Sequence, residues 1–73
     1  MTLVKINPIR GLKRDINPVT ICTRSNGHAA IEIAAKKVYG SNVYAKKSNV
    51  KDMYSAVRIS GSIIGEFHAE ILK

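Results

Sequence analysis

Apolar and polar side chains alternate at the start of the chain, with Leu3 on one side and Val4 and Ile6 on the other. This period of two predicts a short strand over residues 2–6, because neighbouring side chains of a strand point to opposite faces of the sheet. A run rich in β-branched residues predicts a second strand at 19–24.

Two similar proline-containing segments separate these strands, Ile-Asn-Pro-Ile at 6–9 and Ile-Asn-Pro-Val at 16–19. Proline lacks the amide proton that a strand donates and biases the preceding residue toward extended geometry. We therefore expect a basic loop between the two strands, carrying Arg10, Lys13 and Arg14.

The apolar spacing then changes to that of a helix, which we expect at residues 28–39 after a Ser-Asn-Gly turn. Gly40 follows where helices often end, and Lys36 and Lys37 occupy the last turn, where the helix dipole favours cations. Ile33 projects from the opposite side of the helical wheel and is expected on the exposed side. The stripe that should face the sheet consists of Ile31, Ala34, Ala35 and Val38.

After the helix, alternation predicts three antiparallel strands, and two registers are open for the last pair. The strands occupy residues 42–47, 52–60 and 62–72. A two-residue loop pairs Val57 with Ile64, which mixes the apolar and polar faces. A three-residue loop pairs Val57 with Gly65, and Ile59 then opposes Ile63. Because a one-residue slip moves every side chain to the other face, we expect an odd-length or bulged turn and the second register.

The chain is therefore expected to form one small α+β domain over residues 1–73, with one helix packed on a mostly antiparallel sheet in the order ββαβββ. A content of 45% hydrophobic and 23% charged residues is typical of globular domains. The expected core contains Ile31, Ala34, Val38, Val57, Ile59, Ile63, Phe67 and Ile71. The expected outer face of the last two strands contains Tyr54, Arg58, Glu66 and His68.

Cysteine and histidine are too few for the common covalent and metal sites. Cys22 is the only cysteine in the sequence and is expected to be a small buried hydrophobe on its strand, in a protein of a reducing compartment. His28 and His68 have no evident acid or nucleophile beside them, and no catalytic, zinc or nucleotide motif occurs. We therefore expect no metal, no cofactor and no enzymatic activity.

No apolar run reaches the ~20 residues of a membrane span, and the N-terminus lacks the apolar stretch of a secretion signal. These features predict a cytoplasmic protein without membrane association.

Positive charge is the strongest chemical signal, since 12 lysines and arginines face 5 aspartates and glutamates, for a net charge of +7. Residues 1–51 hold ten of these basic side chains and two of the acidic ones. Such a charge favours nucleic acid or an acidic protein surface, with a solvated basic surface as the alternative. The candidate contact residues form three clusters, which are Arg10, Lys13 and Arg14; Lys36 and Lys37; and Lys46, Lys47 and Lys51.

Three apolar or aromatic residues are candidate anchors beside these cations. Tyr44 and Tyr54 are expected on the outer sheet face, where their rings would stack on exposed bases. Glu66 and Glu70 on the same face would repel phosphates, which makes the loops and the helix end better candidates for anion binding. Ile33 or Tyr44 would supply an apolar contact to a protein partner.

The segment at 19–47 begins Val-Thr-Ile-Cys-Thr-Arg-Ser and continues with an alanine-rich helix, a glycine and a strand. This order resembles the middle of small phage-encoded proteins, and some anti-CRISPR proteins, short domains with one helix on an antiparallel sheet, are similar in layout. The resemblance covers under half of the chain and includes no diagnostic motif, so no functional residue is transferred. It implies a mobile-element protein that blocks or occupies a nucleoprotein.

Three functions from different classes remain open at this point. The first is a non-enzymatic module that binds nucleic acid or a nucleoprotein complex, with an affinity that falls steeply with salt. The second is a phage-encoded inhibitor whose cations meet carboxylates of a host protein. The third is a small structural subunit of a larger assembly, and a homodimer is compatible with each.

Overall fold

The computed structural model describes residues 1–72 as one helix and a five-stranded sheet. The elements are β1 (Thr2–Gly11), β2 (Val19–Thr23), α1 (Gly27–Tyr39), β3 (Val43–Lys47), β4 (Met53–Arg58) and β5 (Ile63–Ile71). The strands lie in the order β2-β1-β5-β4-β3, and every neighbouring pair is antiparallel. The predicted α+β class and the order ββαβββ are thereby confirmed.

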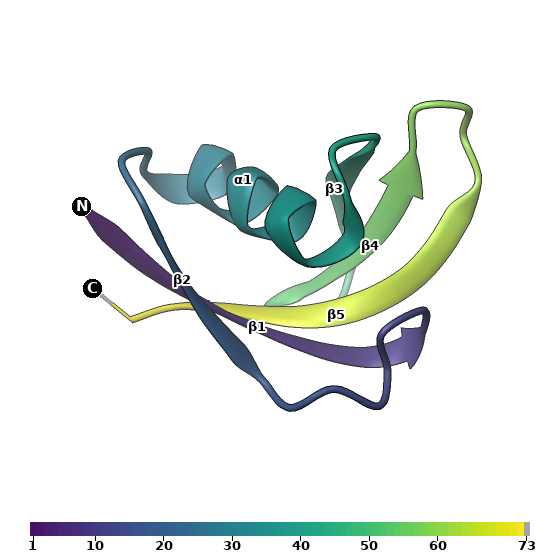
Figure 1. The fold of residues 1–73 in the computed structure, drawn as a ribbon, viewed down its shortest axis with the longest axis horizontal. Helices are drawn as coiled ribbons and strands as arrows, with labels where there is room; N and C mark the ends of the chain where they lie inside the picture. The colour runs from purple at the N-terminus through teal and green to yellow at the C-terminus, as the bar shows by residue number, and fades with distance from the viewer. Residues whose placement is uncertain (73) are drawn as a thin grey trace.

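The sheet curves strongly, and α1 lies on its concave side (Figure 1). The largest fully buried side chains are those of Phe67, Ile6 and Val4, which project from β5 and β1 toward the helix. The helix meets them mainly with the small side chains of Ala30, Ala34 and Ala35, all of which are buried. The core is therefore thin, and the sheet supplies most of its bulk.

β1 is longer than the sequence predicts, because Pro8 lies within the strand. Leu3 accepts a hydrogen bond from the backbone of Leu72, so the odd residues of β1 direct their backbone groups toward the C-terminal strand and the even residues toward β2. Pro8 therefore faces the β2 side, where the ladder has already ended at the pair of Ile6 and Val19. The missing amide proton falls where no strand requires it.

Two glycines allow β1 and β5 to approach each other closely after the register shift between Pro8 and Arg10. Gly11 has a φ of 80°, and a Cβ at this position would lie 2.5 Å from the carbonyl oxygen of Ile64. A Cβ at its partner, Gly65, would lie 2.9 Å from the carbonyl oxygen of Arg10. The close contact between the two strands thus depends on both glycines.

The register between β4 and β5 differs from the prediction. Tyr54 pairs with Phe67 and Ala56 with Gly65, which turns Tyr54 and Ala56 toward the core. A β-bulge between Ala56 and Val57 then shifts the register. The expected bulged connection is therefore present, but the expected register is wrong, because alternation cannot be extrapolated across the bulge.

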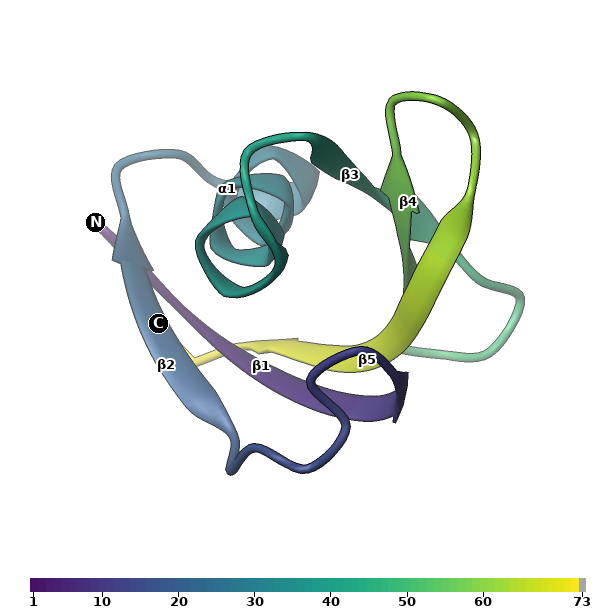
Figure 2. The same cartoon turned by 45° about the vertical axis from the view of Figure 1, so that its right-hand side comes forward.

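The bulge also changes the core. Four predicted members, Ile31, Ala34, Val57 and Phe67, are buried, and Val38 is partly buried. Three predicted members are wrong, because Ile59, Ile63 and Ile71 are exposed. The first two flank the tip of the β4–β5 hairpin, beyond the part of the sheet that α1 covers, as Figure 2 shows.

Cys22 is also exposed rather than buried. It pairs with Leu3 on the edge strand β2, between Ile21, which packs against the core, and the buried Thr23. Its side chain therefore points to the outer face of the sheet.

Candidate anion-binding surface

Three segments that are distant in the sequence meet at one end of the curved sheet, the end that opens toward the viewer in Figure 2. They are the β1–β2 loop, the last turn of α1 and the β4–β5 hairpin. The amide of Leu12 donates to the carbonyl of Ile64 at 2.9 Å, which joins the loop to β5. The amide of Ile59 donates to Asn42 at 2.9 Å, which joins the hairpin to the segment that follows the helix. We call this end of the molecule the open end.

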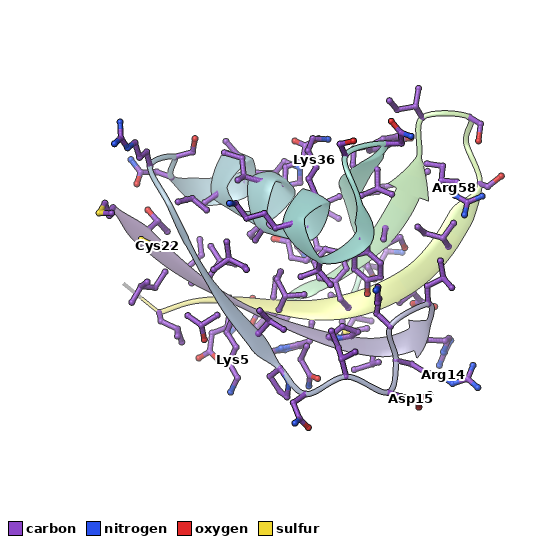
Figure 3. All side chains as sticks on the ribbon, in the orientation of Figure 1. Lys5, Arg14, Asp15, Cys22, Lys36 and Arg58 are labelled. Carbon is purple, nitrogen blue, oxygen red and sulfur yellow. The ribbon has the colours of Figure 1, made fainter. Side chains whose placement is uncertain are left out.

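The open end gathers most of the predicted contact residues. We call its basic side chains the cationic rim; they are Arg10, Lys13, Arg14, Lys36, Lys37 and Arg58. Figure 3 shows Arg14 and Arg58 at this end, whereas Lys5 lies on the convex side of the sheet. The acidic side chains of the same segments are Asp15 and Glu66. The open end therefore has a clear excess of positive charge.

Two members of the cationic rim have acidic partners, and both pairs are exposed. Arg10 lies opposite Glu66 in the β1–β5 ladder, with 3.3 Å between its guanidinium and the carboxylate. Arg14 lies 4.0 Å from its neighbour Asp15. Exposed ion pairs of this kind contribute about 0–1 kcal/mol, so they leave the guanidinium groups available to another anion.

Lys36 has a structural role that the sequence did not reveal. Its ammonium group donates to the backbone oxygen of Val43 at the start of the edge strand β3. This hydrogen bond ties the last turn of α1 to the sheet. Lys36 is therefore less available to a ligand than Lys37, which is exposed on the same turn.

The third predicted cluster does not join the cationic rim. Lys46 lies on the outer face of β3 opposite Ser55, and Lys47 and Lys51 belong to the β3–β4 hairpin on the far side of the molecule in Figure 2. The ammonium group of Lys47 donates to the carbonyl oxygens of Ser48 and Val50, at 3.1 and 3.0 Å. It also lies 5.4 Å from the centre of the Tyr54 ring. Lys47 thus stabilises its own turn.

The outer face of the sheet carries mixed charge. Lys5 lies opposite Glu70, just as Arg10 lies opposite Glu66. Alternating signs weaken the field that a phosphate backbone would meet there. On this face, therefore, basic and acidic side chains lie opposite each other, whereas the loops and the helix end carry mainly basic side chains.

The three proposed anchors differ in their surroundings. Tyr54 is 8% exposed and stacks on Phe67, with 5.7 Å between ring centres and an interplanar angle of 14°. Its predicted place on the outer face is wrong, because the β4 register turns it inward; burial and the charge of Asp52 raise its pKa. Tyr44 is exposed on the outer face, as predicted, and Ile33 on α1 is half-buried.

Tyr39 lies inside the open end, with its ring 5.7 Å from that of Phe67. Its hydroxyl group is buried and has no hydrogen-bond partner among the described residues. Burial raises the pKa of Tyr39 to about 12. The phenol therefore stays neutral and contributes no charge to the surface.

Sequence reasoning missed two features of the open end. Arg58 joins the cationic rim, because its partner in β3 is Val43 at the helix-tied end of that strand. Ile59 and Ile63 are exposed beside it instead of being part of the core. The Ser-Gly-Ser turn between them was the available signal, since a hairpin tip commonly lies outside the covered part of a sheet.

Other kinds of site find little support in the described residues. Residues 1–72 enclose no pocket and contain no group of three or more His, Cys, Asp or Glu side chains placed to hold a metal ion. His28 lies 3.7 Å from Glu32 on the same helix, an exposed pair one turn apart. The one helix in this part of the chain is not long and apolar enough to cross a membrane.

Comparison with known proteins adds no relative to this picture. No protein-family model, no curated protein and no solved structure matches the chain.

Proposed function

We propose that this protein is a non-enzymatic binding module whose cationic rim contacts a polyanion, either nucleic acid or a nucleoprotein complex. The observation that carries the proposal is the lack of internal neutralisation. Among the lysines and arginines that the structure describes, only Arg10 and Arg14 lie within 4.0 Å of a carboxylate. Lys36 and Lys47 donate to backbone oxygens, and the other described lysines and arginines make no side-chain hydrogen bond or ion pair that would compete with a partner.

The arrangement suits the contacts that a phosphate backbone requires. Lysine and arginine side chains at loop and element ends neutralise phosphates and release counterions, which gives affinity without sequence readout. Lys13 and Arg14 project from a loop, and Arg58 projects from the end of a strand on the other side of the opening. Cations on several sides of one opening can contact successive phosphates of one strand.

A salt titration with paired charge variants tests this proposal. Binding of a 20-base-pair duplex and of single-stranded RNA would be measured by fluorescence anisotropy at increasing salt for the wild type and for Lys13→Gln/Arg14→Gln. The loss of two phosphate contacts should reduce the slope of log K against log[salt] by about 1.8 for duplex DNA and by about 1.4 for a single strand. Arg24→Gln/Lys51→Gln removes the same charge from the opposite end and is the matched control.

The control variant should leave the slope near that of the wild type. Equal effects of the two double variants would show that only net charge matters and that the open end has no special role. Binding that does not change with salt would contradict the polyanion proposal as a whole.

A second candidate function is inhibition of a host protein by a phage-encoded chain. The observation that favours it is the exposed apolar surface beside the cationic rim, because phosphate contacts alone do not need it.

A further inference from the structure

The most exposed large apolar side chains in the strands and hairpins described here flank one turn. Ile59 is 74% exposed and Ile63 is 65% exposed, on either side of the Ser-Gly-Ser tip of the β4–β5 hairpin. Tyr44, at 38% exposure, lies on the adjacent strand. We call Tyr44, Ile59 and Ile63 the apolar tip.

The register brings the three residues of the apolar tip together at one end of the sheet. Val57 pairs with Tyr44 on β3 and, past the register shift, with Ile63 on β5, so Tyr44 and Ile63 lie on the two sides of Val57. Ile59 lies in the turn directly after β4, between Arg58 and the Ser-Gly-Ser tip. Val57 itself is only 3% exposed, so the exposed apolar area at this end comes from its neighbours.

The hairpin presents this patch in a defined conformation. The amide of Arg58 donates to the carbonyl of Ser62 at 2.8 Å, and the amide of Gly61 donates back to Arg58 at 2.7 Å. The amide of Ile59 is held by Asn42 at 2.9 Å. A partner would therefore meet side chains that are already positioned, which reduces the entropy lost on binding.

The charges around the apolar tip define the chemistry of its partner. Arg58 adjoins Ile59 in the chain, and Lys46 lies on the same face as Tyr44, two residues along β3. In the row of the sheet that contains Lys46, Arg10 lies opposite Glu66 and forms an ion pair with it, so these two side chains together add no net charge. An apolar centre with a basic border matches an apolar segment that carries carboxylates at its edges. A second copy of the chain would bring the same cations face to face, so self-association is disfavoured.

From this combination we infer that the apolar tip is a docking site for a protein segment that carries apolar side chains flanked by aspartate or glutamate. The site adjoins the proposed polyanion surface and shares Arg58 with it, but its apolar contact does not depend on polyanion binding. Ile59, Ile63 and Tyr44 supply the apolar contact, and Arg58 and Lys46 select acidic partners.

Selection from a random displayed peptide library tests the inference without knowledge of the natural partner. The folded wild-type protein is the bait, and Ile59→Ser/Ile63→Ser is the counter-bait. Val50→Ser removes an exposed apolar side chain from the other hairpin and is the matched control. Circular dichroism and thermal unfolding verify that each variant is folded.

We expect enriched peptides that combine apolar residues with Asp or Glu, bind the wild type and Val50→Ser equally, and bind the double Ile variant at least tenfold more weakly. A change of Arg58 to Gln should weaken the same peptides and reduce their preference for acidic residues. Enrichment of basic or purely polar peptides, binding that is indifferent to the two isoleucines, or no enrichment at all would each overturn the inference.

The duplex DNA titration with the same variants separates this inference from the proposed function. If the apolar tip docks a protein segment, the DNA affinity of Ile59→Ser/Ile63→Ser should lie within twofold of that of the wild type. If that variant loses DNA binding tenfold while the selected peptides bind unchanged, the isoleucines serve nucleic acid and the protein-docking site is refuted. If no variant binds DNA but the peptides behave as expected, the polyanion proposal fails and the docking site stands.

Discussion

The two hairpins that connect β3, β4 and β5 use their side chains in opposite ways. In the β3–β4 hairpin, Lys47 folds back onto the carbonyl oxygens of its own turn and onto the ring of Tyr54. In the β4–β5 hairpin, Ile59 and Ile63 project into solvent and Arg58 makes no ion pair within the part of the chain that the structure describes. The first hairpin uses the ammonium group of Lys47 internally, although Val50 and Lys51 at its tip are exposed. The second combines two highly exposed isoleucines with an arginine that makes no ion pair within the described residues.

Both hairpins pack against the side chain of Phe67, and removal of this side chain should cause the largest loss of stability. The ring is fully buried and contacts Tyr39 on the open-end side and Tyr54 on the side of the β3–β4 hairpin. Phe67→Ala is expected to cost about 3–5 kcal/mol of unfolding free energy. A domain of this size has about 4–11 kcal/mol in total, so the variant should be partly or fully unfolded in urea titrations followed by circular dichroism.

Phe67→Leu, which keeps most of the apolar volume, should remain folded. A Phe67→Ala variant that loses less than about 1 kcal/mol would mean that the two hairpins do not share this support.

The next largest effect should come from the strand contact beneath the open end. Gly11→Ala combines a positive φ with a Cβ only 2.5 Å from a carbonyl oxygen, whereas Gly61→Ala at the hairpin tip has a positive φ and no atom within 4 Å. We expect losses of about 3 kcal/mol and about 1–2 kcal/mol. Equal losses in thermal or urea unfolding would show that the strands relax apart and that the glycine contact does not shape the open end.

These assignments show which parts of the fold follow from local pattern. The helix and the element order follow from side-chain periodicity, which acts over a few residues, and they were predicted correctly. The register of β4 was not, because the bulge that leaves Ile64 of β5 without a partner on β4 and the stacking of Tyr54 on Phe67 depend on contacts between strands. The error placed Ile59 and Ile63 in the core, since alternation does not reveal where α1 stops covering the sheet.

For the candidate anion-binding surface, too, some features follow from the sequence alone and others depend on contacts between strands. An excess of cations is visible in composition, and the Lys13 and Arg14 loop was identified from its breakers. The separation of Lys47 from the cationic rim was not visible, because it depends on strand order and on the geometry of one turn. The inclusion of Arg58 depends on its pairing with Val43. The strand order is therefore needed to predict where the charges gather, whereas the net charge follows from the composition alone.

The tyrosines on the two sides of Phe67 allow a smaller test. The Tyr39 hydroxyl is buried without a partner, and burial raises the pKa of Tyr39 from 10.0 to about 12. The folded state therefore retains the proton while the unfolded state loses it, so stability is constant below pH 10 and falls as the pH rises toward 12. Tyr39→Phe should remove the part of the pH dependence that comes from this hydroxyl group. At neutral pH the variant should also be more stable than the wild type, by up to about 1 kcal/mol, because it no longer buries a hydroxyl group without a partner.

Urea unfolding of the wild type and Tyr39→Phe at pH 7, 9, 10 and 11 measures both effects. A difference between them that stays constant from pH 9 to pH 11 would show that the Tyr39 hydroxyl ionises freely in the folded protein.

Substitutions of Lys47 and Lys51 test whether the ammonium group of Lys47 stabilises the β3–β4 hairpin. Lys47→Gln loses two hydrogen bonds to the turn and the contact with the Tyr54 ring, at an expected cost of about 1 kcal/mol. Lys51→Gln removes the same charge from an exposed side chain and should cost less than about 0.5 kcal/mol. If the two variants unfold at the same urea concentration, Lys47 is as free as Lys51, and the contrast between the hairpins disappears.

The smallest expected effect is also the one that most sharply separates the two descriptions of the β4–β5 hairpin. If Ile59 and Ile63 were core residues, as side-chain alternation predicts, replacing both by serine would cost several kcal/mol, about 2–5 for each. Because both are mostly exposed, Ile59→Ser/Ile63→Ser should unfold within about 0.5 kcal/mol of the wild type, with an unchanged urea m-value. A large loss of stability would place the isoleucines inside the fold and leave the hairpin no apolar surface for a partner. A small loss of stability would mean that the two isoleucine side chains contribute almost nothing to folding. Their apolar surface would then be available for contact with another molecule.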